Sequence, residues 1–201
     1  IDLLGRDFAA RLRTRYAPLP KEIDRIVIVT LDDETYRVSG QRLPFPRWLH
    51  AQAIDGFMSV QPLAVAYDFV FGGAGYTAEE DETFKQSLKK AHRIVLASLV
   101  GSDFEEHGPS EDFLSDTVVK GPINKYPTAD GVLRWGLPYF LDKETGEQKW
   151  SWEFATLFQA GLVKPEEVSL HSNVLWARPL EEKGFQVPVN AHSFYYFNYF
   201  A

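Results

Sequence analysis

Cysteine is absent from the chain of 201 residues, so disulfides and thiolate metal sites are excluded, while the cellular compartment stays open. No stretch reaches the ~18 consecutive apolar residues that a membrane-spanning helix needs. Basic residues are outnumbered by acidic ones, 21 to 28, and the net charge of −7 argues against a nucleic-acid partner. The chain shows no signal peptide and starts at Ile1 instead of Met, so we expect a segment of a longer protein.

The usual signatures of catalysis are missing as well. The glycine-rich stretch 72–75 matches neither G-x-G-x-x-G nor G-x-x-x-x-G-K-[ST], and a turn explains it better than a phosphate-binding loop. The serines lack the G-x-S-x-G elbow of hydrolases, and the five histidines show no metal-ligand spacing. We therefore expect no enzymatic activity and no cofactor in this segment.

What the chain has is the composition of an ordinary globular protein, with 45% hydrophobic and 24% charged residues. Fifteen Phe, nine Tyr and five Trp predict an aromatic-rich core or interface. A chain of this length buries enough surface to fold without disulfides or metals. Since no internal repeat and no clean linker is visible, we expect a single domain over residues 1–201.

The most informative stretch is the apolar run Ile26–Leu31, which leads into the acidic residues Asp32 and Asp33. A continuous run of mostly β-branched residues predicts a strand buried on both faces, as in a parallel sheet covered by helices. Ligands of such sheets bind outside the carboxyl ends of the strands. The two aspartates therefore mark the end of the sheet at which we expect a site.

Helices and strands alternate after this run, which is typical of β-α-β units. We expect an α/β fold with a mainly parallel or mixed central sheet, helices on both faces, a β-α-β-α-β core and further C-terminal strands. The strand containing Ile28 should lie between those containing Val65 and Leu96. The other core elements are a helix over 47–60, a strand over 63–71, a helix over 80–91 opened by a capping box at 77–80, and a strand over 94–99.

The elements outside the core are predicted from shorter patterns. Pro188 places its strand at a sheet edge, because proline donates no ladder hydrogen bond. We expect a helix over 2–15, a loop over 35–46, a strand over 132–141, a turn over 142–147, a helix over 152–160 capped by Ser151, and strands over 174–178, 185–189 and 194–200.

Three acids at predicted strand ends are candidates for a site. Asp32 and Asp33, with Asp68 of the neighbouring strand, could hold Mg²⁺ or Ca²⁺, which prefer oxygen ligands. Adjacent residues of a strand point to opposite faces, however, so Asp32 and Asp33 need not converge. The simpler interpretation, which we favour, is that they bond loop amides or cap the turn after the strand.

Asp68 also raises the question of its partner. The alternation of its strand places it among small side chains inside the fold, and a buried carboxylate needs a cation or amide donors. Arg47 is the first candidate and Arg134 the second. The pair is either a structural ion pair or one wall of a ligand pocket, and the sequence does not separate the two. The predicted ligand-binding residues are Asp32, Asp33, Arg47, Asp68 and Arg134.

Several stretches, taken in order, resemble a known family. They are the opening helix with Leu12-Arg13, the run 26–33, Pro44-Phe45-Pro46-Arg47 followed by His50, the strand 64–71, Asp81-Glu82 leading to Phe84 and Leu88, and the stretches 94–97, 121–124, 130–134 and 197–199. Together they resemble the second type of CHASE domain, the extracellular sensory module of bacterial cyclases, histidine kinases and related signalling enzymes.

The resemblance implies a periplasmic or extracellular input domain of a cytoplasmic-membrane protein, with a cytoplasmic enzyme as its output and no catalysis in this segment. It implies an unidentified small-molecule or protein signal, flanking membrane helices that this sequence lacks, and a fold truncated at its C-terminal end. Two alternatives remain. One is a divalent-metal phosphohydrolase using Asp32, Asp33 and Asp68, and the other is a protein-interaction scaffold without a small ligand. A homodimer is also left open.

Overall fold

The computed structural model divides by its contacts into two compact units, residues 1–42 with 197–201, and residues 43–196. No helix in the described part of the chain is long and apolar enough to cross a membrane. The expectation of a single domain stays a prediction. The structure describes residues 3–18, 21–102, 105–142, 145–171, 174–177, 185–188 and 195–196.

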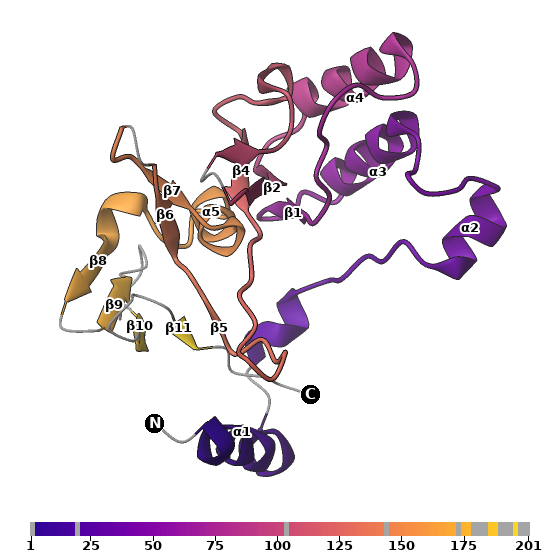
Figure 1. The fold of residues 1–201 in the computed structure, drawn as a ribbon. Coiled ribbons are helices and arrows are strands. Elements are labelled where there is room, and N and C mark those ends of the chain that lie inside the picture. The colour runs from indigo at the N-terminus through magenta and orange to yellow at the C-terminus, as the bar shows by residue number, and fades with distance from the viewer. Residues whose placement is uncertain are drawn as a thin grey trace. The chain divides into compact units, whose positions relative to one another are not determined.

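The first unit contains helix α1 (Leu3–Tyr16), the 3₁₀ turn η1 (Lys21–Arg25) and helix α2 (Asp33–Ser39) (Figure 1). The helix predicted over 2–15 is confirmed by α1. Part of the loop predicted over 35–46 is helical instead, because Asp32 and Thr35 form a capping box that starts α2.

The run 26–31 is not the buried central strand that the sequence predicts. Its backbone is extended but belongs to no strand, and the side chains of Ile26 to Val29 are between 63% and 83% exposed. That prediction is wrong, as is the placement of Ile28 between two strands. A β-branched run favours extended backbone locally, but its burial depends on a partner that the local sequence does not specify.

The second unit is built on a sheet of four strands, in which β2 is central. β1 (Val65–Tyr67) and β4 (Val118–Pro122) pair in parallel with β2 (Ile94–Val100), one on each side. The short β3 (Glu106–His107) pairs antiparallel with the end of β2. The prediction of a mixed α/β sheet is confirmed, with β2 in the place expected for the run 26–31.

Two helices cover one face of this sheet, as Figure 1 shows. α3 (Arg47–Ser59) leads into β1, and α4 (Ala78–Lys90) connects β1 to β2, as predicted. The Thr77 side chain accepts a hydrogen bond from the Glu80 N–H at 3.2 Å and so starts α4. The shared core consists of buried side chains from both helices and the strands, including Ile54, Phe84, Leu88, Ile94 and Leu96.

Helix α5 (Trp152–Gln159) packs against β2 and β4. Val95 and Ala97 of β2 are fully buried and alternate with Ile94 and Leu96, so they face the side opposite α3 and α4. A Cβ at Gly121 would lie 2.8 Å from the Trp152 nitrogen, so glycine lets β4 approach α5 closely. Helices therefore lie on both faces, as predicted.

The elements after β4 are shorter than the sequence predicts. The strand expected over 132–141 is split around Pro138 into β5 (Trp135–Gly136) and β6 (Tyr139–Leu141), and Pro188 lies on an edge strand, as expected. β4, β8 (Val168–His171) and the 3₁₀ turn η3 (Pro165–Glu167) were not predicted as elements, whereas the 3₁₀ turn η2 (Glu111–Phe113) lies where the sequence predicts a short turn of helix, over 111–114. Positions 178, 189, 194 and 197–200 of the predicted C-terminal strands lie outside the described residues. The remaining strands form three small sheets. β5 pairs with β11 (Tyr195–Tyr196), and β6 forms a hairpin with β7 (Gln148–Trp150). β8 pairs antiparallel with β9 (Val174–Ala177), which in turn pairs antiparallel with β10 (Phe185–Pro188).

Candidate functional site

Asp32 is the N-cap of α2. Its Oδ1 accepts a hydrogen bond from the Thr35 N–H at 3.0 Å, and the Thr35 hydroxyl accepts one from the Asp32 N–H at 3.3 Å. The bonds from Thr35 lower the pKa of the Asp32 carboxyl. The interpretation that these acids cap the turn after the run is confirmed for Asp32, and Asp33 follows it, exposed, in the first turn of α2.

Asp68 is exposed, and no described residue forms a hydrogen bond or ion pair with it. The prediction that it is buried against Arg47 or Arg134 is wrong, because β1 ends at Tyr67 and its alternation does not extend to the next residue. Among the residues that the structure describes, no three His, Asp or Glu side chains are grouped so as to hold a metal ion. The geometry thus gives no support to a metal-dependent phosphohydrolase.

Arg47 is 6% exposed at the first position of α3 and holds a loop together. Its guanidinium donates to the carboxylate of Asp81 on α4 and, at 2.6 Å, to the carbonyl of Gly73. Asp81 also accepts the Gly75 N–H at 3.0 Å, and a Cβ at Gly75 would overlap that carboxylate. The glycine-rich stretch is therefore a loop closed around a buried ion pair.

Arg134 is equally buried and has a similar role in a different turn. It donates to both carboxylate oxygens of Asp130 at 2.8 Å and to the hydroxyl of Thr128. The guanidinium is the main reason that the pKa of Asp130 lies far below its usual range. The two arginines thus form ion pairs within loops and turns, with Asp81 and Asp130, and neither is the predicted partner of Asp68.

A cavity of about 230 Å³ lies beside Arg47 and His50. His50 is 5% exposed, and its ring lies 5.0 to 6.0 Å from the rings of Phe71, Phe69 and Tyr67. Burial lowers the pKa of His50 to about 4, and the charge of Arg47 adds to this. The imidazole is therefore neutral near pH 7, and it acts as a member of an aromatic cluster.

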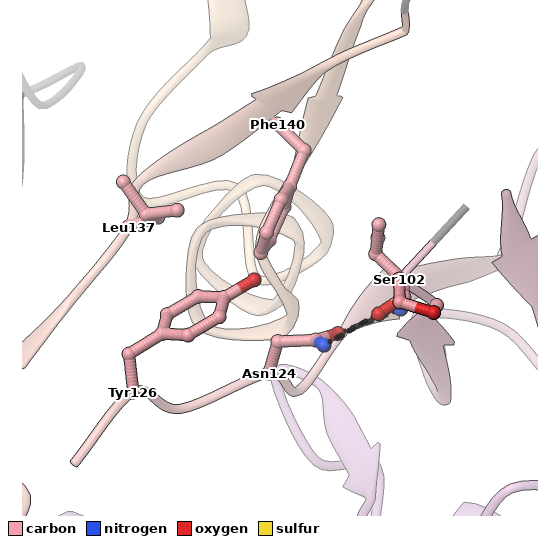
Figure 2. Close-up of a pocket in the computed structure, with 7 residues that line it drawn as sticks. Ser102, Asn124, Tyr126, Leu137 and Phe140 are labelled. Atoms are coloured by element: carbon pink, nitrogen blue, oxygen red, sulfur yellow. Dashed lines mark hydrogen bonds between the residues drawn. The ribbon is translucent and has the colours of Figure 1, made fainter. Parts of the chain in front are cut away.

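A larger cavity, of about 430 Å³, lies at the carboxyl ends of β2 and β4. This is the position at which ligands bind in open α/β sheets. Figure 2 shows Tyr126 and Phe140 on its walls, with the Tyr126 hydroxyl directed toward the space between Phe140 and Asn124. The two rings have their centroids 6.5 Å apart. The cavity is lined by Val100, Gly101, Ser102, Asn124, Tyr126, Leu137 and Phe140.

Asn124 fixes the floor of this cavity to the end of β2. Its Oδ1 accepts the Val100 N–H at 2.7 Å, and its Nδ2 donates to the Val100 carbonyl at 2.8 Å. Both polar groups of the last residue of β2 are thus satisfied by one side chain. Because the amide already bonds the Val100 backbone through its oxygen and one N–H, it offers a ligand one further N–H, and the rest of the lining is mainly apolar.

The hairpin β6–β7 positions Phe140. Lys149 lies opposite Phe140 in the hairpin register, and its ammonium lies 2.7 Å from Asp142 and 3.9 Å from Glu106 of β3. The hydrogen bond with Asp142 is the main reason that the pKa of Lys149 is raised. Because Glu106 belongs to the strand paired with β2, this ion pair connects the hairpin, and the Phe140 wall with it, to the central sheet.

The chemistry of the cavity follows from its lining. None of the lining side chains is charged, and most of the wall is aliphatic or aromatic carbon. A charged ligand would lose its hydration here without gaining a counter-ion. The cavity suits a small, uncharged and mainly apolar molecule, with the Ser102 hydroxyl at its exposed rim as a polar contact.

This cavity was not predicted, because the run 26–31 was expected to be the central strand of the sheet. The rule about the carboxyl ends of parallel strands was sound but was applied to the wrong strand. β4 contains Gly121 and Pro122, which argue against a strand from sequence alone. The stretch 121–124, noted for its family resemblance, was the signal that could have placed Asn124 at this site.

Comparison with known proteins identifies a family for this chain. No curated protein matches the chain, and no solved structure matches it. A family model described as the CHASE2 domain matches residues 1–200. Domains of this family are extracellular sensory domains of signalling receptors and are not catalytic. Since the match covers almost the whole sequence, the chain belongs to the CHASE2 domain family.

Proposed function

We propose that this segment is the input domain of a membrane-bound bacterial receptor and that the cavity at the ends of β2 and β4 binds its signal. The observation that carries the proposal is a space of about 430 Å³ with no charged side chain in its lining, at the ligand-binding end of a parallel sheet. The signal is a small, uncharged, mainly apolar molecule. Family membership supports the sensory role.

Binding is tested with phenol and indole as neutral aromatic probes and benzoate as a charged one, followed by NMR chemical shifts of the 201-residue chain. We expect the neutral probes to shift the resonances of Tyr126 and Phe140, and benzoate to leave them unchanged, because the lining offers no counter-ion. Equal binding of benzoate, or shifts confined to other regions, would contradict the proposal.

Filling the cavity gives a matched pair of variants. Leu137→Trp places a larger ring inside the lining, whereas Leu141→Trp makes the same change at a position that is 59% exposed and outside it. We expect the first variant to reduce probe affinity at least tenfold, about 1.4 kcal/mol, and the second to leave it unchanged. In the intact receptor, only Leu137→Trp should alter output activity.

The location and output are part of the same proposal. The domain lies in the periplasm or outside the cell, and the cytoplasmic output is a histidine kinase or a nucleotide cyclase. Because this segment has no cysteine, Val60→Cys at a position that is 76% exposed gives a single labelling site within it. Labelling of intact cells by a membrane-impermeant maleimide supports the outside location, and labelling only after lysis refutes it.

A further inference from the structure

The cavity of about 230 Å³ beside Arg47 and His50 differs in chemistry from the larger one. The two cavities share no lining residue, and every residue that lines the smaller one belongs to the unit 43–196. It lies between the first turn of α3 and the segment 69–76 that follows β1. Its volume is below the roughly 300 Å³ of pockets that hold drug-sized ligands, so an occupant is small.

The walls of this cavity are held by bonds that need no ligand. The loop 72–75 is closed around the ion pair of Arg47 with Asp81. The Tyr76 hydroxyl donates to the Pro44 carbonyl at 2.9 Å, which joins the end of this loop to the segment before α3. A site that is already ordered in this way loses little conformational entropy when a ligand binds.

His50 supplies an unpaired polar group. Its side chain is 5% exposed and lines the cavity, and its ring nitrogens form no hydrogen bond with any residue that the structure describes. A neutral imidazole has one donor and one acceptor nitrogen. Leaving such groups unpaired inside a protein is unfavourable, so a ligand with a polar group of its own would be stabilised beside this ring.

The charge of the lining selects the sign of that ligand. Arg47 and Glu80 are its charged side chains, and the charge of Arg47 is balanced by Asp81. One carboxylate oxygen of Glu80 accepts the Arg47 backbone N–H at 3.3 Å, which holds this carboxylate at the cavity. No basic side chain in the described part of the chain forms an ion pair with Glu80. The lining therefore offers one carboxylate without a cationic partner.

The rest of the lining favours a cation as well. Four aromatic side chains line the cavity, and the faces of aromatic rings attract positive charge. They are Phe45, Phe69, Phe71 and Tyr76. We propose that this cavity binds a small organic ammonium ion, with its charge at Glu80 and its apolar part against these rings. Because His50 is neutral, its ring acts as a hydrogen-bond acceptor and adds no positive charge that would repel the ligand.

The test is an NMR titration of the 201-residue chain with benzylamine, which is protonated at pH 7. Benzyl alcohol and benzoate are the neutral and negative probes of similar size. We expect benzylamine to shift the resonances of His50 and Tyr76 with a dissociation constant of about 1 mM, and the other two probes to bind there at least about tenfold more weakly. Equal binding of benzyl alcohol, or no shift up to roughly 20 mM benzylamine, would overturn the proposal.

The two cavities are distinguished in the same spectra. Tyr126 lines only the larger cavity and Tyr76 only the smaller one. Benzylamine shifts confined to Tyr126 would overturn this inference and would also contradict the preference of the larger cavity for neutral ligands. Shifts of Tyr76 by benzylamine support it even if no neutral probe ever shifts Tyr126, so the inference does not rest on the proposed function.

Two variants of neighbouring acids test the charge. Glu80→Gln keeps an acceptor for the Arg47 N–H and removes the charge, whereas Glu79→Gln makes the same change one position earlier in α4, outside the lining. We expect the first variant to weaken benzylamine binding about tenfold and the second less than about twofold. Equal weakening by both would indicate attraction to an acidic surface and would overturn the site.

A third variant tests the aromatic wall. Phe69→Leu replaces an aromatic face beside His50 with an aliphatic side chain. We expect it to weaken benzylamine binding about threefold, and an unchanged affinity would overturn the contribution of the rings. Unchanged resonances of Tyr126 in all three variants show that the fold is intact, so that weaker binding reports on the cavity itself.

Discussion

Acidification should destabilise this protein through His50. Burial and the nearby charge of Arg47 lower the pKa of its imidazole from 6.5 to about 4 in the folded state. Between these values the unfolded chain binds a proton at His50 and the folded chain does not, so stability falls as the pH falls. The difference of roughly 2.5 pKa units predicts a loss of about 2 kcal/mol between pH 7 and pH 5 and about 3 kcal/mol by pH 4.

The assay is urea unfolding followed by circular dichroism at pH 7, 6 and 5, above the range in which most carboxylates titrate. His50→Gln keeps a neutral polar side chain and should remove most of the pH dependence. His92→Gln makes the same change at an exposed histidine and should retain it. If wild type and His50→Gln lose equal stability between pH 7 and pH 5, the buried neutral imidazole is refuted.

Two further comparisons use the same unfolding assay. Arg47→Met removes one side of a buried ion pair and should lower the free energy of unfolding by about 3 kcal/mol, whereas Lys85→Met, which breaks a pair with an exposed acid, should cost less than about 1 kcal/mol. Similar effects of the two variants would contradict the structural role of Arg47. Gly121→Ala should destabilise by about 1 to 3 kcal/mol, because its Cβ would meet the Trp152 backbone. Gly56→Ala, with open space around it inside α3, should stabilise by about 0.5 to 1 kcal/mol, and the reverse order would show that β4 and α5 are not in close contact.

The sequence predicted the elements whose signals are local. The helices around Ile54 and Phe84 follow from apolar residues at helical spacing, and α4 begins at the predicted Thr77 cap. The strand around Leu96 is a continuous apolar run with a parallel neighbour, as expected. In each case the pattern of a single segment contains enough information to set both its secondary structure and its buried face.

The errors come from features that depend on pairing between distant segments. The run 26–31 has a stronger strand pattern than β4, yet β4 lies in the sheet, because Gly121 permits close contact with α5. Asp68 was assigned a buried position by extending the alternation of β1 beyond the end of that strand. Arg47 and Arg134 were predicted only as alternative partners of Asp68. Their actual partners, Asp81 and Asp130, depend on loop geometry that no periodicity encodes.

The paired amide of Asn124 has a mechanical consequence. A strand can shift along its neighbour by two residues and form an equivalent set of backbone hydrogen bonds. The Asn124 side chain bonds both the N–H and the carbonyl of Val100, so its segment has one position relative to β2 in which both bonds form. The floor of the cavity is therefore locked to β2 whether the cavity is empty or filled. We therefore expect movement on ligand binding to come from the opposite wall, which contains Leu137 and Phe140. The hairpin, whose Lys149 lies 3.9 Å from Glu106 of β3, is then the element whose position should differ between an occupied and an empty cavity.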